Sequence, residues 1–73
     1  MNRDEFLRKL EALLEVPPDS LTEDMALEQV AGWDSINVIG YIALVDETFR
    51  KEIDPDKIQE CTTVGRLLDL ALS

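Results

Sequence analysis

Residues 35–50 are apolar around most of the circumference of the helix that their spacing predicts, and such a helix is normally surrounded by other helices. At about 100° per residue, the face expected to meet the core carries four side chains: Val38, Ile42, Val45 and Phe49. Tyr41 and Leu44 extend the apolar surface on the far side. Another sector mixes apolar and charged positions: Ser35, Ile36, Ile39, Ala43, Asp46, Glu47 and Arg50. Packing alone does not explain that mixture, so we predict a partner-binding strip headed by Ser35.

A first helix is predicted at the start of the chain. Asn2 can cap it, with Glu5 as the reciprocal acceptor of a capping box, and Pro17-Pro18 end it near Glu15. Its apolar side chains recur at helical spacing: Phe6, Leu7, Leu10, Leu13 and Leu14. The solvent side is expected to carry Asp4, Glu5, Arg8, Lys9 and Glu11.

Two more helices are predicted after residue 53. Asp54-Pro55 is a cap followed by proline at the first helical position, which indicates a short helix to Glu60. Thr62 or Thr63 caps the last helix, whose apolar positions are Val64, Leu67, Leu68, Ala71 and Leu72. No alternating pattern favours a strand. We therefore expect an all-α fold over residues 1–73, a single domain built as a small four-helix bundle with three long helices and one short one.

The long connection from Pro17 to Asp34 has no sustained period. Leu21, Met25, Leu27 and Val30 are spaced through it, so we expect an ordered loop between the first two helices. At its end, Gly32 permits a sharp turn and Asp34 is a good N-cap for a helix beginning at Ser35. Trp33 is expected to pack its ring against the loop; the alternative is contact with a partner or ligand.

The formal charge of −9 disfavours two classes of partner, nucleic acids and anionic membranes. It suits association with basic patches on other proteins, although it could equally serve only to keep a monomer in solution. No apolar run has membrane-spanning length, and the first residues lack a signal-peptide pattern. With a single cysteine, Cys61, which we interpret as a small buried hydrophobe, these features predict a cytoplasmic protein.

The sequence contains no histidine, so the usual imidazole base for a serine nucleophile is missing. One cysteine and no histidine also exclude an ordinary zinc site. We expect no catalytic residue, no metal and no enzymatic activity of the chain's own. Ser35 would then be an acceptor for another enzyme's chemistry, because the amides and dipole at a helix start favour an attached anion such as a phosphodiester.

The segment Gly32-Trp33-Asp34-Ser35-Ile36 resembles the prosthetic-group attachment motif of acyl carrier proteins, whose usual core is Asp-Ser-Leu. The resemblance covers nearly the whole chain. Leu21-Thr22-Glu23-Asp24 is similar to the family's loop before the attachment site, and Phe49 to the aromatic that closes the second helix. Cys61-Thr62-Thr63-Val64 is similar to the start of the last helix.

The resemblance implies that Ser35, next to Asp34, is esterified by 4′-phosphopantetheine, transferred from coenzyme A by a phosphopantetheinyl transferase. The terminal thiol would carry an acyl group as a thioester. It also implies a partner surface on the second helix: Asp34, Ile36, Ile39, Gly40, Ala43, Asp46 and Glu47. An acyl chain could enter the interior near Ile42, Val45, Phe49, Cys61 and Leu67.

Two positions depart from the family pattern. Ile36 replaces the usual leucine, which conserves volume. Gly40 stands where fatty-acid carriers usually have an acidic residue, so either a partner approaches the backbone there or the helix is loosened. The hypothesis of a specialised polyketide or lipid carrier is therefore as well supported as that of the housekeeping fatty-acid carrier.

The function expected is that of a discrete, monomeric acyl carrier protein. It would deliver acyl intermediates between enzymes of fatty acid, polyketide or specialised lipid biosynthesis that present basic docking patches. The alternatives are an aminoacyl or peptidyl carrier and an unmodified acidic helical adaptor. A serine hydrolase is disfavoured by the missing histidine.

Overall fold

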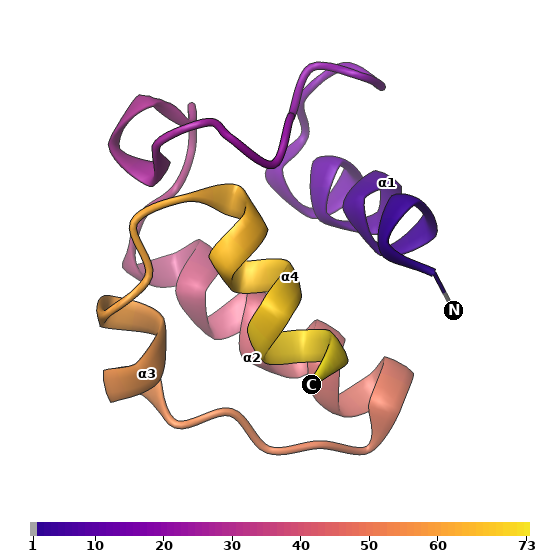
Figure 1. The fold of residues 1–73 in the computed structure, drawn as a ribbon, viewed down its shortest axis with the longest axis vertical. Helices are drawn as coiled ribbons and strands as arrows, with labels where there is room; N and C mark the ends of the chain where they lie inside the picture. Colours follow the sequence, from indigo (N-terminus) through magenta and orange to yellow (C-terminus); the bar gives the residue numbers. More distant parts are fainter. Residues whose placement is uncertain (1) are drawn as a thin grey trace.

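The computed structural model describes residues 2–73 and confirms the predicted all-helical fold (Figure 1). Its helices are α1 (Arg3–Leu14), α2 (Ser35–Phe49), α3 (Pro55–Gln59) and α4 (Val64–Leu72), with a 3₁₀ turn, η1 (Leu27–Gln29), that was not predicted. α4 lies in front of α2, α1 lies at the upper right, and the connection between α1 and α2 arches across the top. No strand forms in the described part, where one isolated bridge joins Ala26 and Thr63. None of the helices in residues 2–73 is long and apolar enough to cross a membrane.

Each helix begins at a residue whose side chain accepts a hydrogen bond from a first-turn amide, as the sequence predicts. The pairs are Asn2 with Glu5 (2.8 Å), Asp34 with Asn37 (3.0 Å), Asp54 with Asp56 (3.0 Å) and Thr63 with Arg66 (3.3 Å). The last pair decides between the two threonines. The helix boundaries are therefore encoded by short local signals.

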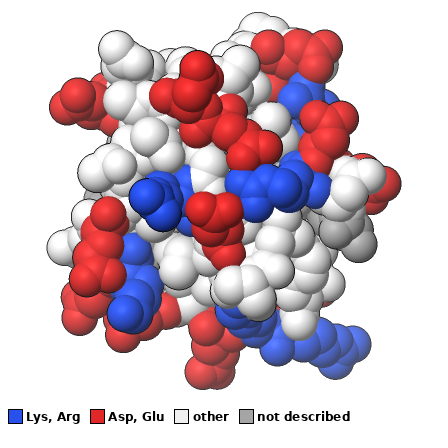
Figure 2. All heavy atoms as spheres, in the orientation of Figure 1, with Lys and Arg blue, Asp and Glu red and all other residues white. Residues whose placement is uncertain are grey.

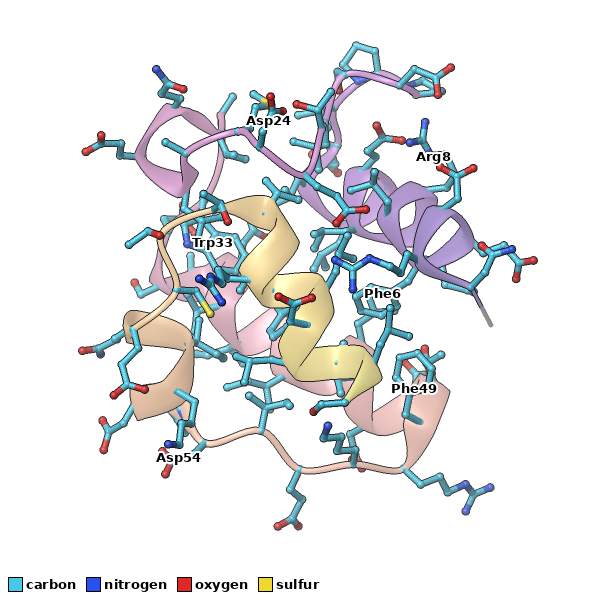
Figure 3. The ribbon with its side chains drawn as sticks, viewed as in Figure 1. Phe6, Arg8, Asp24, Trp33, Phe49 and Asp54 are labelled. Atoms are coloured by element: carbon cyan, nitrogen blue, oxygen red, sulfur yellow. The ribbon has the colours of Figure 1, made fainter. Side chains whose placement is uncertain are left out.

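Tyr41 lies at the centre of the core with none of its surface exposed. Its hydroxyl donates a hydrogen bond to the Leu67 carbonyl of α4, and its ring meets Phe6 of α1 edge-on, with centroids 6.4 Å apart. Our prediction that Tyr41 extends a far side of the helix is wrong. The buried face is rotated toward Tyr41, so that Val45 is fully buried while Val38, Ile42 and Phe49 are only half-buried. Phe49 still contacts Phe6, with ring centroids 5.5 Å apart (Figure 3).

The connection between α1 and α2 is ordered, as expected. Leu21, Leu27 and Val30 are buried and Met25 is half-buried. Two amides at the start of α4 also donate to loop carbonyls, Val64 to Met25 (3.0 Å) and Gly65 to Glu23 (2.8 Å). These bonds satisfy donors that a helix start otherwise leaves open.

Glu11 is buried, with 2% of its surface exposed, so its predicted position on the solvent side of α1 is wrong. One carboxylate oxygen accepts from the Leu21 amide (3.0 Å), and the other lies 3.3 Å from the Arg8 guanidinium. The loop folds back over this side of α1 and brings a backbone donor to the carboxylate. The hydrophobic periodicity of α1 could not predict this burial, because the Leu21 amide lies outside the helix.

Candidate functional site

Ser35 occupies the first position of α2 and is exposed. None of the side-chain hydrogen bonds found in residues 2–73 involves its hydroxyl. Asp34 directly before it is also exposed, and the Asp34 carboxylate is engaged by the Asn37 amide. The head of α2 thus presents a hydroxyl that is free to react, beside helix amides and a dipole that favour a negative group.

The turn that leads to Ser35 depends on Gly32, whose φ is +83°. A side chain is strained in that region of the backbone map, while glycine adopts it readily. The next amide, Trp33 N–H, donates to the Val30 carbonyl at 3.3 Å. The predicted sharp turn at Gly32 is confirmed.

Asn37 joins the turn to the helix, a role that the sequence reasoning missed. Its backbone amide donates to Asp34 Oδ1, and its side-chain Nδ2 donates to the Gly32 carbonyl. An asparagine in the first turn of a helix that follows a glycine-containing loop can indicate a bond from its side chain back to that loop, because the side-chain amide reaches local backbone groups. Position alone does not say which group it reaches.

Trp33 packs against the hydrophobic core, and one of its contacts is with α2. Its half-buried ring meets Tyr41 edge-on, with centroids 6.1 Å apart and planes at 79°. Figure 3 shows Trp33 just before the start of α2. The residue before the Asp34 cap is therefore anchored to the core through an aromatic pair.

The outward side of α2 carries large apolar side chains in contact with water. Ile36 is 76% exposed and Ile39 is 67% exposed. We call the exposed set formed by Ile36, Ile39, Ala43, Asp46 and Glu47 the outward strip. Gly40 is half-buried instead, and a Cβ built on it would lie 2.9 Å from Leu13 Cδ1. The close approach at this glycine is made by the chain's own α1.

Positive charge is absent from a long central stretch of the sequence, because no Lys or Arg occurs between Lys9 and Arg50. All of α2 lies inside that stretch. On the face that carries α4, by contrast, Lys and Arg side chains alternate with acidic ones (Figure 2). The end of the molecule that presents Ser35 therefore has acidic neighbours in sequence and no basic residue on its helix.

Residues 4–71 match the family described as "Phosphopantetheine attachment site". The chain belongs to this family of carrier proteins. It is also 22% identical to an acyl carrier protein of Saccharopolyspora erythraea, over 99% of this chain and 80% of that protein. No solved structure matches the chain. The family's cofactor is 4′-phosphopantetheine, and its members are carriers that interact with a phosphopantetheinyl transferase and with biosynthetic enzymes.

The head of α2 has the properties that a phosphopantetheine-carrying protein needs. An exposed hydroxyl without a protein partner can be esterified without breaking an existing bond. The first turn of α2 itself contains no acidic residue, and the neighbouring Asp34 carboxylate is bonded to the Asn37 amide as the helix cap. The Ser35 environment therefore fits the family's cofactor.

The residues expected to line an acyl pocket differ in their burial and in the hollows that they face. Val45 and Leu67 are fully buried, whereas Ile42, Phe49 and Cys61 are half-buried. Ile42 faces an open hollow of about 440 Å³ between α2 and α3, lined by Ile39, Ile42, Ala43, Asp46, Glu52, Ile53 and Pro55. Cys61 faces different hollows, beside α4 and beside η1.

Cys61 is half-buried rather than fully buried. Its thiol donates to the Lys57 carbonyl at 3.4 Å, and burial raises the pKa of that thiol above its ordinary value. A raised pKa keeps the sulfur protonated and weakly nucleophilic near neutral pH. Within residues 2–73, no group of His, Cys, Asp and Glu side chains is arranged to hold a metal ion.

Proposed function

We propose that Ser35 is the attachment point of 4′-phosphopantetheine and that the chain carries acyl intermediates as thioesters on that arm. It would deliver them between enzymes of fatty acid, polyketide or specialised lipid biosynthesis. The observation that carries the proposal is the exposed, unbonded Ser35 hydroxyl at the head of α2, inside a segment that matches the attachment family. The acyl cargo is supported by the relative's name, acyl carrier protein.

The attachment reaction makes Ser35 the nucleophile and a separate transferase the catalyst. Ser35 Oγ forms a bond to the phosphorus that bears the pantetheine, and the pyrophosphate P–O bond of coenzyme A breaks. Adenosine 3′,5′-bisphosphate leaves, and the hydroxyl proton passes to a base of the transferase. The chain itself contains no histidine to accept that proton. When attached, the arm supplies a terminal thiol for the thioester bond.

The outward strip is the surface we propose for docking partner enzymes. Ile36 and Ile39 offer apolar area that docking would remove from water. Asp46 and Glu47 in the strip, and Asp34 next to it, offer charges for basic patches. Ser35 lies at the head of this strip. A partner seated there would have the attachment point beside its edge.

The hollow between α2 and α3 offers a binding place for a short cargo. Ser35, Ile39, Ile42 and Asp46 follow one side of α2, and Ile39 is about 6 Å along the helix axis from Ser35. The hollow has apolar side chains from both flanking segments, Ile42 and Ile53 among them. An acyl group on the arm could reach it without entering the core between α2 and α4.

The attachment is tested by intact mass after incubating the apo protein with coenzyme A and a broad-specificity transferase. We expect one phosphopantetheine addition to the unaltered chain and to the control Ser20→Ala, and none to Ser35→Ala. Addition to Ser35→Ala would overturn the assignment of the residue. An unaltered chain that several competent transferases leave unmodified would instead support the adaptor hypothesis.

The cargo class is tested on the loaded arm. An acyl ligase should convert the phosphopantetheinylated protein to a thioester, whereas an aminoacyl-adenylating enzyme should not. Loading only by the second enzyme would make the chain an aminoacyl or peptidyl carrier.

A further inference from the structure

We propose that Asn37 is a positioning residue for phosphopantetheine transfer, because its side chain holds the Gly32–Asp34 turn in the conformation that presents Ser35. This inference rests on the proposed attachment at Ser35. It concerns a residue whose side chain is bonded to the Gly32 carbonyl and not to the Ser35 hydroxyl.

Asn37 contacts both ends of the turn. Its backbone amide donates to Asp34 Oδ1 at 3.0 Å, next to Ser35, and its side-chain Nδ2 donates to the Gly32 carbonyl at the other end. The first bond is an ordinary helix cap and requires no particular side chain at position 37. The second bond requires a side chain with a donor.

The Gly32 carbonyl belongs to the least restricted residue of the turn. Glycine has more backbone conformations available than other residues, so fixing its φ at +83° costs more conformational entropy. Trp33 is fixed by its ring against Tyr41, and Asp34 by its cap bond. The bond from Asn37 is thus the side-chain contact that restrains Gly32, five residues before it in the chain.

A loosened turn would present Ser35 in the productive conformation only part of the time. A partner that binds the productive conformation then shows an apparent affinity reduced by that fraction. Loss of one hydrogen bond of ordinary strength corresponds to a factor of about five. The KM for the apo carrier should therefore rise, by up to about fivefold, with kcat within about twofold, because the docked complex restores the turn.

Two substitutions separate this role from helix stability. Asn37→Ala removes the donor. Asn37→Leu also removes it, and leucine has a higher helix propensity than asparagine and adds no charge beside Ser35, so the helix should be at least as stable as before. The matched control is Asn2→Ala, which removes the cap of α1 at a comparable cost without touching the turn.

The experiment measures transfer kinetics with a phosphopantetheinyl transferase, together with acrylamide quenching of Trp33, the single tryptophan. We expect a raised KM and increased quenching in both Asn37 variants, and values close to the unaltered protein in Asn2→Ala. Unchanged KM and quenching in the Asn37 variants would overturn the inference, as would an equal rise of KM in Asn2→Ala. An unaltered chain that accepts no phosphopantetheine would overturn the proposed function instead, before any variant is compared.

Discussion

The two sides of α2 carry similar apolar side chains in opposite surroundings. Tyr41 and Val45 are completely buried, whereas Ile36 and Ile39 on the other side are 76% and 67% exposed. Burial of a large apolar side chain contributes about 1.5–3 kcal/mol to folding, and an exposed one contributes almost none of this. The buried side of α2 therefore stabilises the fold, whereas the outward side contributes little to stability and is available for contacts with other proteins.

The largest expected effect on folding lies at the centre of the buried side. Tyr41→Ala removes a ring that packs against Phe6 and Trp33 and should lower the free energy of unfolding by about 3–5 kcal/mol. Tyr41→Phe keeps the ring but removes the hydroxyl and its hydrogen bond to the Leu67 carbonyl, for a loss of about 1 kcal/mol. Urea titration followed by circular dichroism measures both. Equal stability of Tyr41→Phe and the unaltered chain would mean that the hydroxyl contributes nothing.

The same comparison extends to acidic residues. Glu11→Ala should cost about 1–3 kcal/mol, because it leaves the buried Leu21 amide without its acceptor. Glu47→Ala, on the exposed side of α2, is the matched control and should leave the unfolding midpoint unchanged. Equal midpoints for the two variants would show that the Glu11 carboxylate is not needed to hold the loop.

Substitutions at two glycines are expected to have smaller effects, which differ in size. A Cβ at Gly65 would lie 3.0 Å from the Glu23 carbonyl oxygen, which is fixed by its bond to the Gly65 amide. Gly65→Ala should therefore destabilise by about 1 kcal/mol. At Gly40 the obstacle is a Leu13 methyl that can rotate away, and alanine gains about 0.5–1 kcal/mol of helix propensity, so Gly40→Ala should change stability by less than about 0.5 kcal/mol. Thermal melts of both variants measure the difference, and a larger loss at Gly40 would contradict this account.

The smallest effect on folding is expected at the outward strip. Replacing Ile36 and Ile39 together by serine should change stability by less than about 0.5 kcal/mol, since both are exposed. If the strip docks partners as proposed, kcat/KM for phosphopantetheine transfer should fall about tenfold. Transfer at an unchanged rate would show that the transferase does not use these side chains.

Much of the fold could be predicted because its signals are local. Asn2, Asp34, Asp54-Pro55 and Thr63 each cap a helix through a group a few residues away. The 3.6-residue pattern was also sufficient to place Val64, Leu67, Leu68 and Ala71 in the core.

The errors share a different cause, which is contact with distant segments. α2 is apolar nearly all round, so periodicity could not choose its buried side, and the partners of Tyr41 on α1 and α4 decided it. Glu11 is buried because the loop brings the Leu21 amide to it. At the candidate site, the exposed Ser35 and the Asp34 cap could be predicted, but the bond from Asn37 to Gly32 depends on how the turn closes.

Tyr41 has one further consequence, for where a guest molecule can be housed. Its ring contacts Phe6 of α1 and Trp33 just before the attachment point, and its hydroxyl donates to Leu67 of α4. Separating α2 from α4 would therefore leave the buried Tyr41 hydroxyl without its acceptor. No comparable bond joins α2 to α3 among the described side chains. If the protein expands to accommodate cargo, separating α2 from α3 should therefore cost less free energy than separating α2 from α4. Tyr41 would keep α2 and α4 together while α3 moves.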